Sequence, residues 1–218
     1  MSDSSDKTEL LGFLTVIEHV PLGRVGGFLV LNQAGRPVEF HCTSPVRANR
    51  AQEILYGSSL YPFLYGEQIA GTLVSKTKSP VTLLLTDSIP VLAVQESVDL
   101  PVVYVCARKR EEGEQGERGN EQVRQSLLDF GIENAVRTDE DTEKNEREKA
   151  RRLHDIPGLS VARWREIECG NQWIGVPAGN EEELEIFRRR FQRLAKTLDI
   201  AEPFERIRLA VEETQKAA

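Results

Sequence analysis

Asp87 is placed where mixed α/β proteins often keep reactive groups. It ends a short apolar run, residues 81–86, which is typical of a strand buried on both faces. In open α/β sheets, ligands and reacting groups gather beyond the carboxyl ends of the strands. We therefore take Asp87 as the first candidate for chemistry. The competing interpretation is structural, because Asp87 and Ser88 could form an Asx-type turn that ends the strand.

Three other groups of reactive residue types have simpler structural interpretations. Glu18 and His19 are typical of a solvated strand end. His41 and Cys42 are adjacent in a predicted strand, so their side chains point to opposite faces and cannot form a nucleophile–base pair. The glycines between residues 23 and 27 are followed neither by Gly-Lys-Ser/Thr nor by a helix. This excludes a phosphate-binding loop and favours a turn or a bulge.

Aromatic and basic residues also allow two interpretations each. Trp164 and Trp173 could form a platform for a base or a peptide, but a small core beneath helices is favoured. The arginines at 188–190 follow glutamates by one turn, as expected of ion pairs on a helix surface. Three tyrosines could line a groove, but packing at a helix junction is favoured: Tyr56, Tyr61 and Tyr65.

The elements that would position Asp87 alternate in type. Three antiparallel strands are expected first, with a hairpin turn at residues 32–35. Two helices follow, and Ser44-Pro45 resembles the start of the first one. The predicted order is strands at 10–17, 28–31 and 38–43, helices at 44–56 and 60–76, a strand at 81–86, a short element at 89–95 and a strand at 102–106. This order predicts a mixed α/β domain over residues 10–106.

Composition changes sharply after residue 106. Of the 46 residues from 107 to 152, 24 are charged, which predicts a flexible linker with one short helix near 122–130. Residues 153–218 predict a small α+β unit with a hairpin and helices at 181–198 and 203–215, the first capped by Asn180. Residues 1–9 are expected to form a disordered tail.

Charge and cysteine content limit the function classes. The net charge of −7 disfavours nucleic acid as the partner and leaves a protein partner as the expectation. Three scattered cysteines indicate neither a disulfide framework nor a zinc ribbon, and a reducing cytoplasm fits best. No apolar run approaches the roughly 20 residues needed to span a bilayer, so we expect no membrane insertion.

The order of motifs in the N-terminal half resembles that of a known superfamily. The motifs are a strand ending at Glu18, Gly-Gly at 26–27 before Phe-Leu-Val-Leu, a turn at Gly35, a helix carrying Glu67, and Leu-Leu-Leu-Thr-Asp-Ser at 83–88. This pattern is similar to the ribonuclease H-like superfamily over residues 10–106. The resemblance implies a mixed sheet in which three antiparallel strands precede helix–strand units.

The resemblance also implies a chemistry. In that superfamily, carboxylates hold two Mg²⁺ ions that clamp the attacking and leaving oxygens of a phosphodiester. Matched by position, Asp87, Glu67 and Glu18 would be the catalytic and metal-binding acids. The chain departs from the pattern in two respects. Glu18 stands where Asp is usual, and no convincing late acid is found, since Asp99 precedes the last strand and the next acids belong to a run expected to be flexible: Glu111, Glu112 and Glu114.

Two function classes therefore remain as expectations. The first is a non-catalytic ribonuclease H-like scaffold that acts as a cytoplasmic binding or assembly protein, without a cofactor. The second is a Mg²⁺-dependent nuclease that uses Glu18, Glu67 and Asp87. The missing late acid and the net acidity favour the first class.

Overall fold

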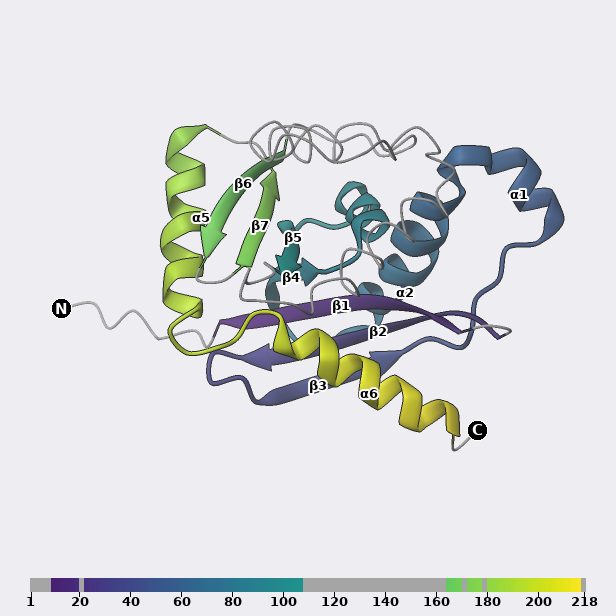
Figure 1. Ribbon diagram of the computed structural model, residues 1–218, viewed down its shortest axis with the longest axis horizontal. Helices are drawn as coiled ribbons and strands as arrows, with labels where there is room; N and C mark the ends of the chain where they lie inside the picture. The colour runs from purple at the N-terminus through teal and green to yellow at the C-terminus, as the bar shows by residue number, and fades with distance from the viewer. Residues whose placement is uncertain (1–8, 20–21, 108–163, 170–171, 178–179, 217–218) are drawn as a thin grey trace, which may run out of the picture.

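The protein is built around one mixed sheet (Figure 1). The computed structural model describes residues 9–19, 22–107, 164–169, 172–177 and 180–216. The seven strands of this part of the chain lie in the order β3-β2-β1-β4-β5-β7-β6. They are β1 (Leu10–His19), β2 (Gly23–Asn32), β3 (Pro37–Cys42), β4 (Val81–Thr86), β5 (Val102–Ala107), β6 (Trp164–Cys169) and β7 (Gln172–Pro177).

Strand direction confirms the predicted fold class. β1 pairs antiparallel with β2, and β2 pairs antiparallel with β3. β1 then pairs parallel with β4, and β4 pairs parallel with β5. Three antiparallel strands followed by parallel strands give the mixed α/β, ribonuclease H-like order that the resemblance implies.

Helices cover both faces of the sheet. The helices of the described residues are α1 (Arg50–Tyr56), the short η1 (Gly57–Ser59), the π-helix η2 (Pro62–Ala70), α2 (Gly71–Lys76), the 3₁₀-helix η3 (Ile89–Glu96), α5 (Glu181–Leu194) and α6 (Glu202–Lys216), and all but α1 and η1 contribute buried residues. One apolar cluster joins α5 and α6 to one face of the sheet, which we call the α6 face. A second cluster joins η2, α2 and η3 to the opposite face, which we call the η2 face.

β4 is buried on both faces, as its apolar run predicts. Leu83 and Leu85 lie in the cluster of the α6 face, whereas Leu84 lies in the cluster of the η2 face. All three side chains are inaccessible to solvent. Such a strand needs cover on both sides, and the two layers of helices supply it.

The glycine pair at 26–27 does not form the predicted turn or bulge. Both residues lie inside β2, opposite Val16 and Thr15 of β1. A Cβ atom on Gly26 would lie 2.2 Å from Ile69 Cγ2 of η2, and one on Gly27 would lie 2.2 Å from Ile207 Cγ2 of α6. The two glycines therefore let helices approach both faces of the same strand, which a local interpretation of glycine does not capture.

The first helix begins later than Ser44-Pro45 predicts. α1 begins at Arg50, and the Asn49 side chain accepts a hydrogen bond from Gln52 N in a capping box. Val46 instead forms a bridge with Arg24, so the segment before the helix extends the sheet. Asn180 caps α5 with Glu183 in the same way, as predicted. The turn at Asn32–Gly35 is also confirmed, with Gly35 at a φ of +71°.

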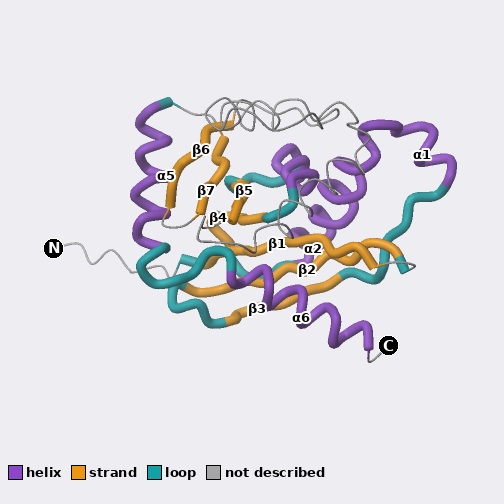
Figure 2. Tube along the Cα trace, viewed as in Figure 1, coloured by secondary structure: helices purple, strands orange, loops and turns teal. Residues whose placement is uncertain are grey.

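The described part of the C-terminal region joins the same sheet. β7 pairs with β5, and α5 and α6 share one apolar cluster with β1, β2 and β4. Figure 2 shows α5 running alongside β6 and β7. The expected small α+β unit is therefore continuous with the N-terminal fold here. The predicted tail up to residue 8, the linker at 108–152 with its short helix, and residues 153–163 lie outside the described residues.

No helix in the described part of the chain has both the length and the apolar character that a membrane span requires.

Candidate functional site

Asp87 lies on the α6 face and is paired with an arginine. Arg208 of α6 donates to Asp87 Oδ2 and also lies 3.6 Å from Glu205. The Asp87 side chain is 18% exposed, and its Oδ1 atom is buried without a hydrogen-bond partner among the described residues. The competing Asx-turn interpretation is not what the strand end shows: Ser88 N donates to Thr86 Oγ1 at 3.1 Å, which makes a threonine turn.

α6 fills the surface beside Asp87. Leu14 of β1 pairs with Thr86 of β4, so continuing the pairing by one residue places Thr15 beside Asp87. Thr15 is only 1% exposed. Phe204 of α6 meets the Phe13 ring edge-on at a centroid distance of 5.6 Å. Ile207 leaves no room even for a methyl group on Gly27. The carboxylate therefore lies at the margin of a packed helix–sheet interface.

Glu18 lies on the opposite side, in a polar cluster with η2. Arg24 Nε of β2 donates to Glu18 Oε1 at 2.9 Å. The Tyr65 hydroxyl of η2 donates to the same oxygen, also at 2.9 Å. The Arg24 guanidinium lies 4.9 Å from the centre of the Tyr61 ring, a cation–π distance. Glu18 is thus held by a cation and a phenol.

Burial sets the protonation of this cluster. Burial, reinforced by the neighbouring Glu18 carboxylate, raises the pKa of Tyr65 above its usual range, so the phenol remains a donor. Burial acts to lower the pKa of Arg24, but Tyr65 and Glu18 outweigh it and the pKa is raised. The guanidinium is therefore charged at neutral pH.

The three acids implied by the resemblance are not brought together. Asp87 contacts α6 and Glu18 contacts η2, so the sheet lies between them. Glu67 is exposed on η2. Among the described residues, no group of three or more histidine, cysteine, aspartate or glutamate side chains is placed to hold a metal ion.

A second polar cluster, not predicted from the sequence, surrounds Glu39 of β3. Its carboxylate accepts from Thr77 Oγ1 at 2.9 Å, from the Lys78 and Ser79 amides at 3.1 Å each, and from the His41 ring at 2.5 Å. Hydrogen bonds from Ser79, His41 and the Lys78 backbone hold the pKa of Glu39 well below its usual range. Glu39 thereby ties the edge of the sheet to the loop before β4.

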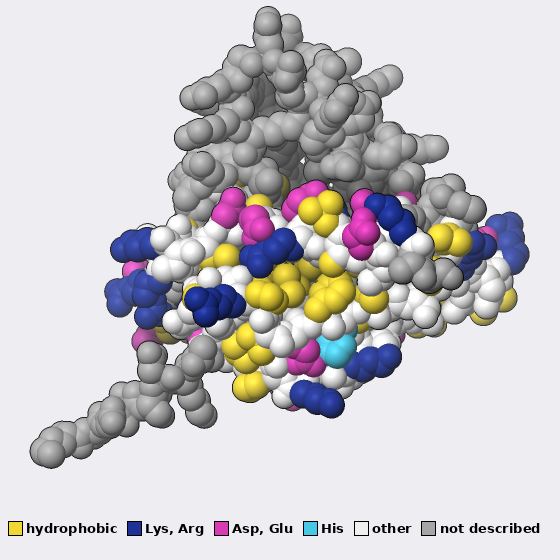
Figure 3. All heavy atoms as spheres, turned by 90° about the horizontal axis from the view of Figure 1, so that it is seen from below, with side chains coloured by type: hydrophobic (Ala, Val, Ile, Leu, Met, Phe, Trp, Pro, Cys, Tyr) yellow, Lys and Arg dark blue, Asp and Glu magenta, His cyan; other side chains and the backbone are white. Residues whose placement is uncertain are grey.

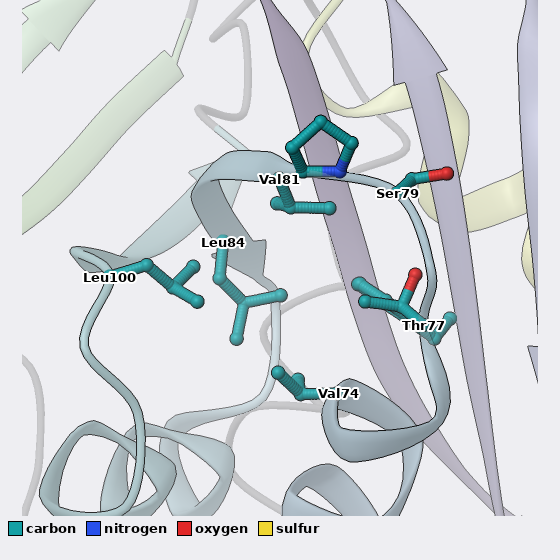
Figure 4. A pocket seen from close by; sticks show the side chains of 8 residues that line it. Val74, Thr77, Ser79, Val81, Leu84 and Leu100 are labelled. Carbon is teal, nitrogen blue, oxygen red and sulfur yellow. The ribbon is translucent and has the colours of Figure 1, made fainter.

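A small apolar pocket lies next to this loop. Its volume is about 240 Å³. Figure 4 shows Val74, Leu84 and Leu100 pointing into it, with Thr77 and Ser79 at its rim. Pockets for drug-sized ligands have volumes of about 300–1,000 Å³, so this one has room only for a smaller group.

The predictions for the tyrosines, the arginines at 188–190 and the tryptophans can also be compared with the structure. Tyr56 stacks on Phe63 at a centroid distance of 4.0 Å, which confirms packing at the helix junction for this tyrosine, whereas Tyr65 binds Glu18 and Arg24 of the sheet. Arg189 pairs with Glu185 at 3.0 Å, as the helix spacing predicts. Arg190 instead contacts Glu9 and Thr82, far away in the sequence. Trp173 is half-buried in β7.

Sequence reasoning missed Arg208, Arg24 and Tyr65 as partners of the candidate acids. The apolar stripe of α6 at Phe204, Ile207 and Val211 sets Arg208 at the border of the buried face, which was a usable signal. The strand end that Arg208 meets is 121 residues away, and no local pattern identifies it.

Comparisons with known proteins add a likeness of fold. No family model and no curated protein matches the chain. Among solved structures, the chain is similar to a Ciona intestinalis endonuclease V variant in complex with inosine-containing DNA. The identity is 12% and the TM-score 0.44, covering 99% of this chain and 89% of that one. It is also similar to human endonuclease V, at 14% identity and a TM-score of 0.43, covering 100% and 89%.

A structure of the catalytic domain of human endonuclease V gives similar values. Its identity is 12% and its TM-score 0.46, with 98% of this chain and 86% of that chain covered. The likeness is one of fold. At these identities and scores, the activity of the neighbours carries no argument about this chain.

Proposed function

We propose that this protein is a non-catalytic binding or assembly protein built on a ribonuclease H-like scaffold. The observation that carries the proposal is the pairing of Asp87 with Arg208, on a helix that packs over the same face of the sheet. The Arg208 guanidinium of the chain itself thus occupies the carboxyl end of β4, the strand end at which chemistry is most expected.

Metal-dependent hydrolysis needs a different arrangement. Several carboxylates must converge with free oxygens on one point, at Mg²⁺–oxygen distances of about 2.0–2.1 Å. In this protein, one oxygen of Asp87 binds the Arg208 guanidinium. Glu18 binds Arg24 and Tyr65 on the opposite face of the sheet. An arginine beside a carboxylate repels a cation, and Arg208 occupies Asp87 Oδ2 and leaves Oδ1 without a partner among the described residues.

The competing proposal is Mg²⁺-dependent phosphodiester hydrolysis through Glu18, Glu67 and Asp87. The neighbouring structures are named as endonuclease V, and the Ciona intestinalis variant is bound to DNA that contains inosine. Likeness at TM-scores below 0.5 adds nothing beyond fold. The net charge of −7 also disfavours a phosphate backbone as partner, so a protein partner is the better match.

A cleavage assay separates the two proposals. The full chain is incubated with Mg²⁺ or Mn²⁺ and with single- and double-stranded DNA and RNA, including inosine-containing DNA, beside an Asp87→Asn variant. We expect no cleavage above a protein-free control. Metal-dependent cleavage that disappears in Asp87→Asn, but persists in the matched surface variant Glu185→Gln, would overturn the scaffold proposal.

A thermodynamic cycle tests the pair that carries the proposal. Asp87 is largely buried and Arg208 is 41% exposed, so the pair lies between the surface and buried cases. We expect Arg208→Met to lower the free energy of unfolding by about 1–2 kcal/mol, because it leaves a largely buried carboxylate unpaired. Asp87→Asn in the same chain should recover part of that loss. Strict additivity of the two changes would contradict the pairing.

A further inference from the structure

The apolar pocket beside the loop before β4 has room for a ring-sized group. Its volume is about 240 Å³, whereas protein interiors contain few voids larger than a water molecule. An apolar cavity of about 150 Å³ is enough to bind benzene. Figure 3 shows that hydrophobic side chains also lie among charged ones on the open surface, where they identify no ligand by themselves. A hollow of this size with apolar walls is a more specific indication.

The lining determines the charge of a matching ligand. Six of the eight lining residues are apolar, and the other two, Thr77 and Ser79, carry only hydroxyl groups. None of the described residues that line the pocket is charged. Moving a charged group from water into such surroundings is costly, because the lining offers no group of opposite charge. The pocket therefore selects an uncharged ligand.

The floor of the pocket is packed from behind. Phe28 and Leu84 are inaccessible to solvent and close the floor. A Cβ atom on Gly12 of β1 would lie 2.6 Å from Phe28 Cε2 and 3.1 Å from Val81 Cγ1. These two lining side chains therefore lie directly over the bare backbone of β1 and have no space to move deeper. The shape of the floor is fixed by the sheet itself.

Hydrogen bonds anchor the two sides of the pocket. On one side, the Glu39 carboxylate accepts from one hydroxyl group and two backbone amides of residues 77–79. On the other side, the Gln95 side chain donates to Leu100 O at 3.3 Å and accepts from Val102 N at 2.8 Å. Figure 4 shows the Leu100 side chain opposite the first segment. Because both sides are anchored, the pocket keeps its volume without an occupant, as preformed ligand sites do.

The surroundings of the pocket favour a free molecule over a side chain of a protein partner. Lys76 and Lys78 flank Thr77, and Asp99 precedes Leu100; all three charged residues are exposed. Lysine and aspartate are depleted in protein–protein interfaces, and charged residues are depleted most at the interface core. The charged residues beside this opening therefore do not match the centre of such an interface.

We propose that this pocket is a binding site for a free, uncharged molecule of one or two rings, the size class of benzene and indole. Val74, Val81 and Leu100 are half-buried, and a ligand would remove their remaining apolar surface from water, which drives binding. The Thr77 hydroxyl donates its proton to Glu39, so at the rim it can accept a hydrogen bond from an N–H group of the ligand. This binding goes beyond the scaffold proposal and does not depend on it.

An NMR titration of the full chain tests the site directly. The isotope-labelled protein is titrated with benzene, with indole, and with benzoate, which adds a charge to a single ring. We expect saturable shift changes at the amides of residues 74–84 and 100, with a dissociation constant for indole of about 1 mM or tighter. Benzoate should bind at least about tenfold more weakly, because its carboxylate would lose water in an apolar pocket. Equal affinity for benzoate, or no saturable change at these residues, would overturn the proposal.

Two variants of Val74 locate the binding in the pocket. Val74 points into the pocket in Figure 4, so Val74→Phe fills the volume and Val74→Asp places a charge in the wall. Each should weaken indole binding at least about tenfold. The matched control Ile54→Phe, at a position of α1 that is 67% exposed, should leave it unchanged. Indole affinity that survives in both Val74 variants would overturn the proposal. None of these measurements involves Asp87 or nucleic acid, so their failure would leave the scaffold proposal to its own cleavage assay.

Discussion

Replacing Gly27 with alanine tests whether α6 is seated directly on the sheet beside Asp87. A Cβ atom at this position would lie 2.2 Å from Ile207 Cγ2 and 3.2 Å from Val211 Cγ2, so α6 would have to move outward. Overpacking of this kind costs about 1–3 kcal/mol. Alanine also restricts the unfolded chain, which returns about 0.4–1 kcal/mol where the backbone is compatible. We therefore expect Gly27→Ala to lower the free energy of unfolding by about 1–2 kcal/mol.

The assay is urea unfolding at equilibrium, with an unchanged slope as evidence that the same surface is exposed. Gly71→Ala is the matched control. Its added Cβ would meet nothing closer than 3.6 Å, and the residue lies in α2. Gly71→Ala should raise the free energy of unfolding by about 0.5–1 kcal/mol, the usual difference between glycine and alanine in a helix.

A second substitution locates the clash. Ile207→Leu removes the Cγ2 branch that the new methyl group would strike and conserves volume, so alone it should cost less than about 1.5 kcal/mol. In the Gly27→Ala background, Ile207→Leu should lower the free energy of unfolding by less than it does in the wild type, or should even raise it. Gly27→Ala that is neutral, or fully additive with Ile207→Leu, would refute the close approach of α6. The closed surface beside Asp87 would then lose its support.

Two further predictions concern the Glu39 cluster and the cap of α1. Because the folded-state pKa of Glu39 is depressed below its ordinary 4.5, the stabilisation is present above that pH and is lost as the pH falls below it. The free energy of unfolding of the wild type should therefore exceed that of Glu39→Gln at neutral pH, and the gap should narrow in acid; a gap that widens in acid would contradict this reasoning. Asn49→Ala should weaken the cap of α1 by about 0.5–2 kcal/mol. Since α1 buries no residue, the loss should appear as faster amide hydrogen exchange at residues 50–56, with little change in global stability.

Elements with a strong apolar pattern were predictable from the sequence. The run at 81–86 predicted a strand covered on both faces, and the stripes of α5 and α6 predicted two amphipathic helices. The cap at Asn180 was equally clear, because a capping residue acts on amides two or three residues away. These features could be predicted because each is determined by residues that are close together in the sequence.

Features that depend on distant partners were not predictable in this way. Gly26 and Gly27 match a turn signal, and only the helices at residues 69 and 207 explain why they lie inside a strand. The cluster at Glu39 depends on a loop about 40 residues away, and Arg208 on a strand end 121 residues away. Likewise, an N-cap signal at Ser44 was overruled by the bridge between Val46 and Arg24, which keeps that segment extended.

Strand parity explains why Glu18 cannot take the place of a first-strand acid beside Asp87. Leu11 and Phe13 of β1 face α6, whereas Leu14 faces η2, so odd positions share the side of Asp87 and even positions do not. Glu18 is even, and its contact with Tyr65 agrees with that parity. The length of the glutamate arm is therefore not the obstacle. The position beside Asp87 belongs to Thr15, which is 1% exposed beneath α6. An acid there would be buried beneath α6, beside the pair that Asp87 forms with Arg208. A metal site at this strand end therefore requires displacement of α6 and not merely one exchanged side chain.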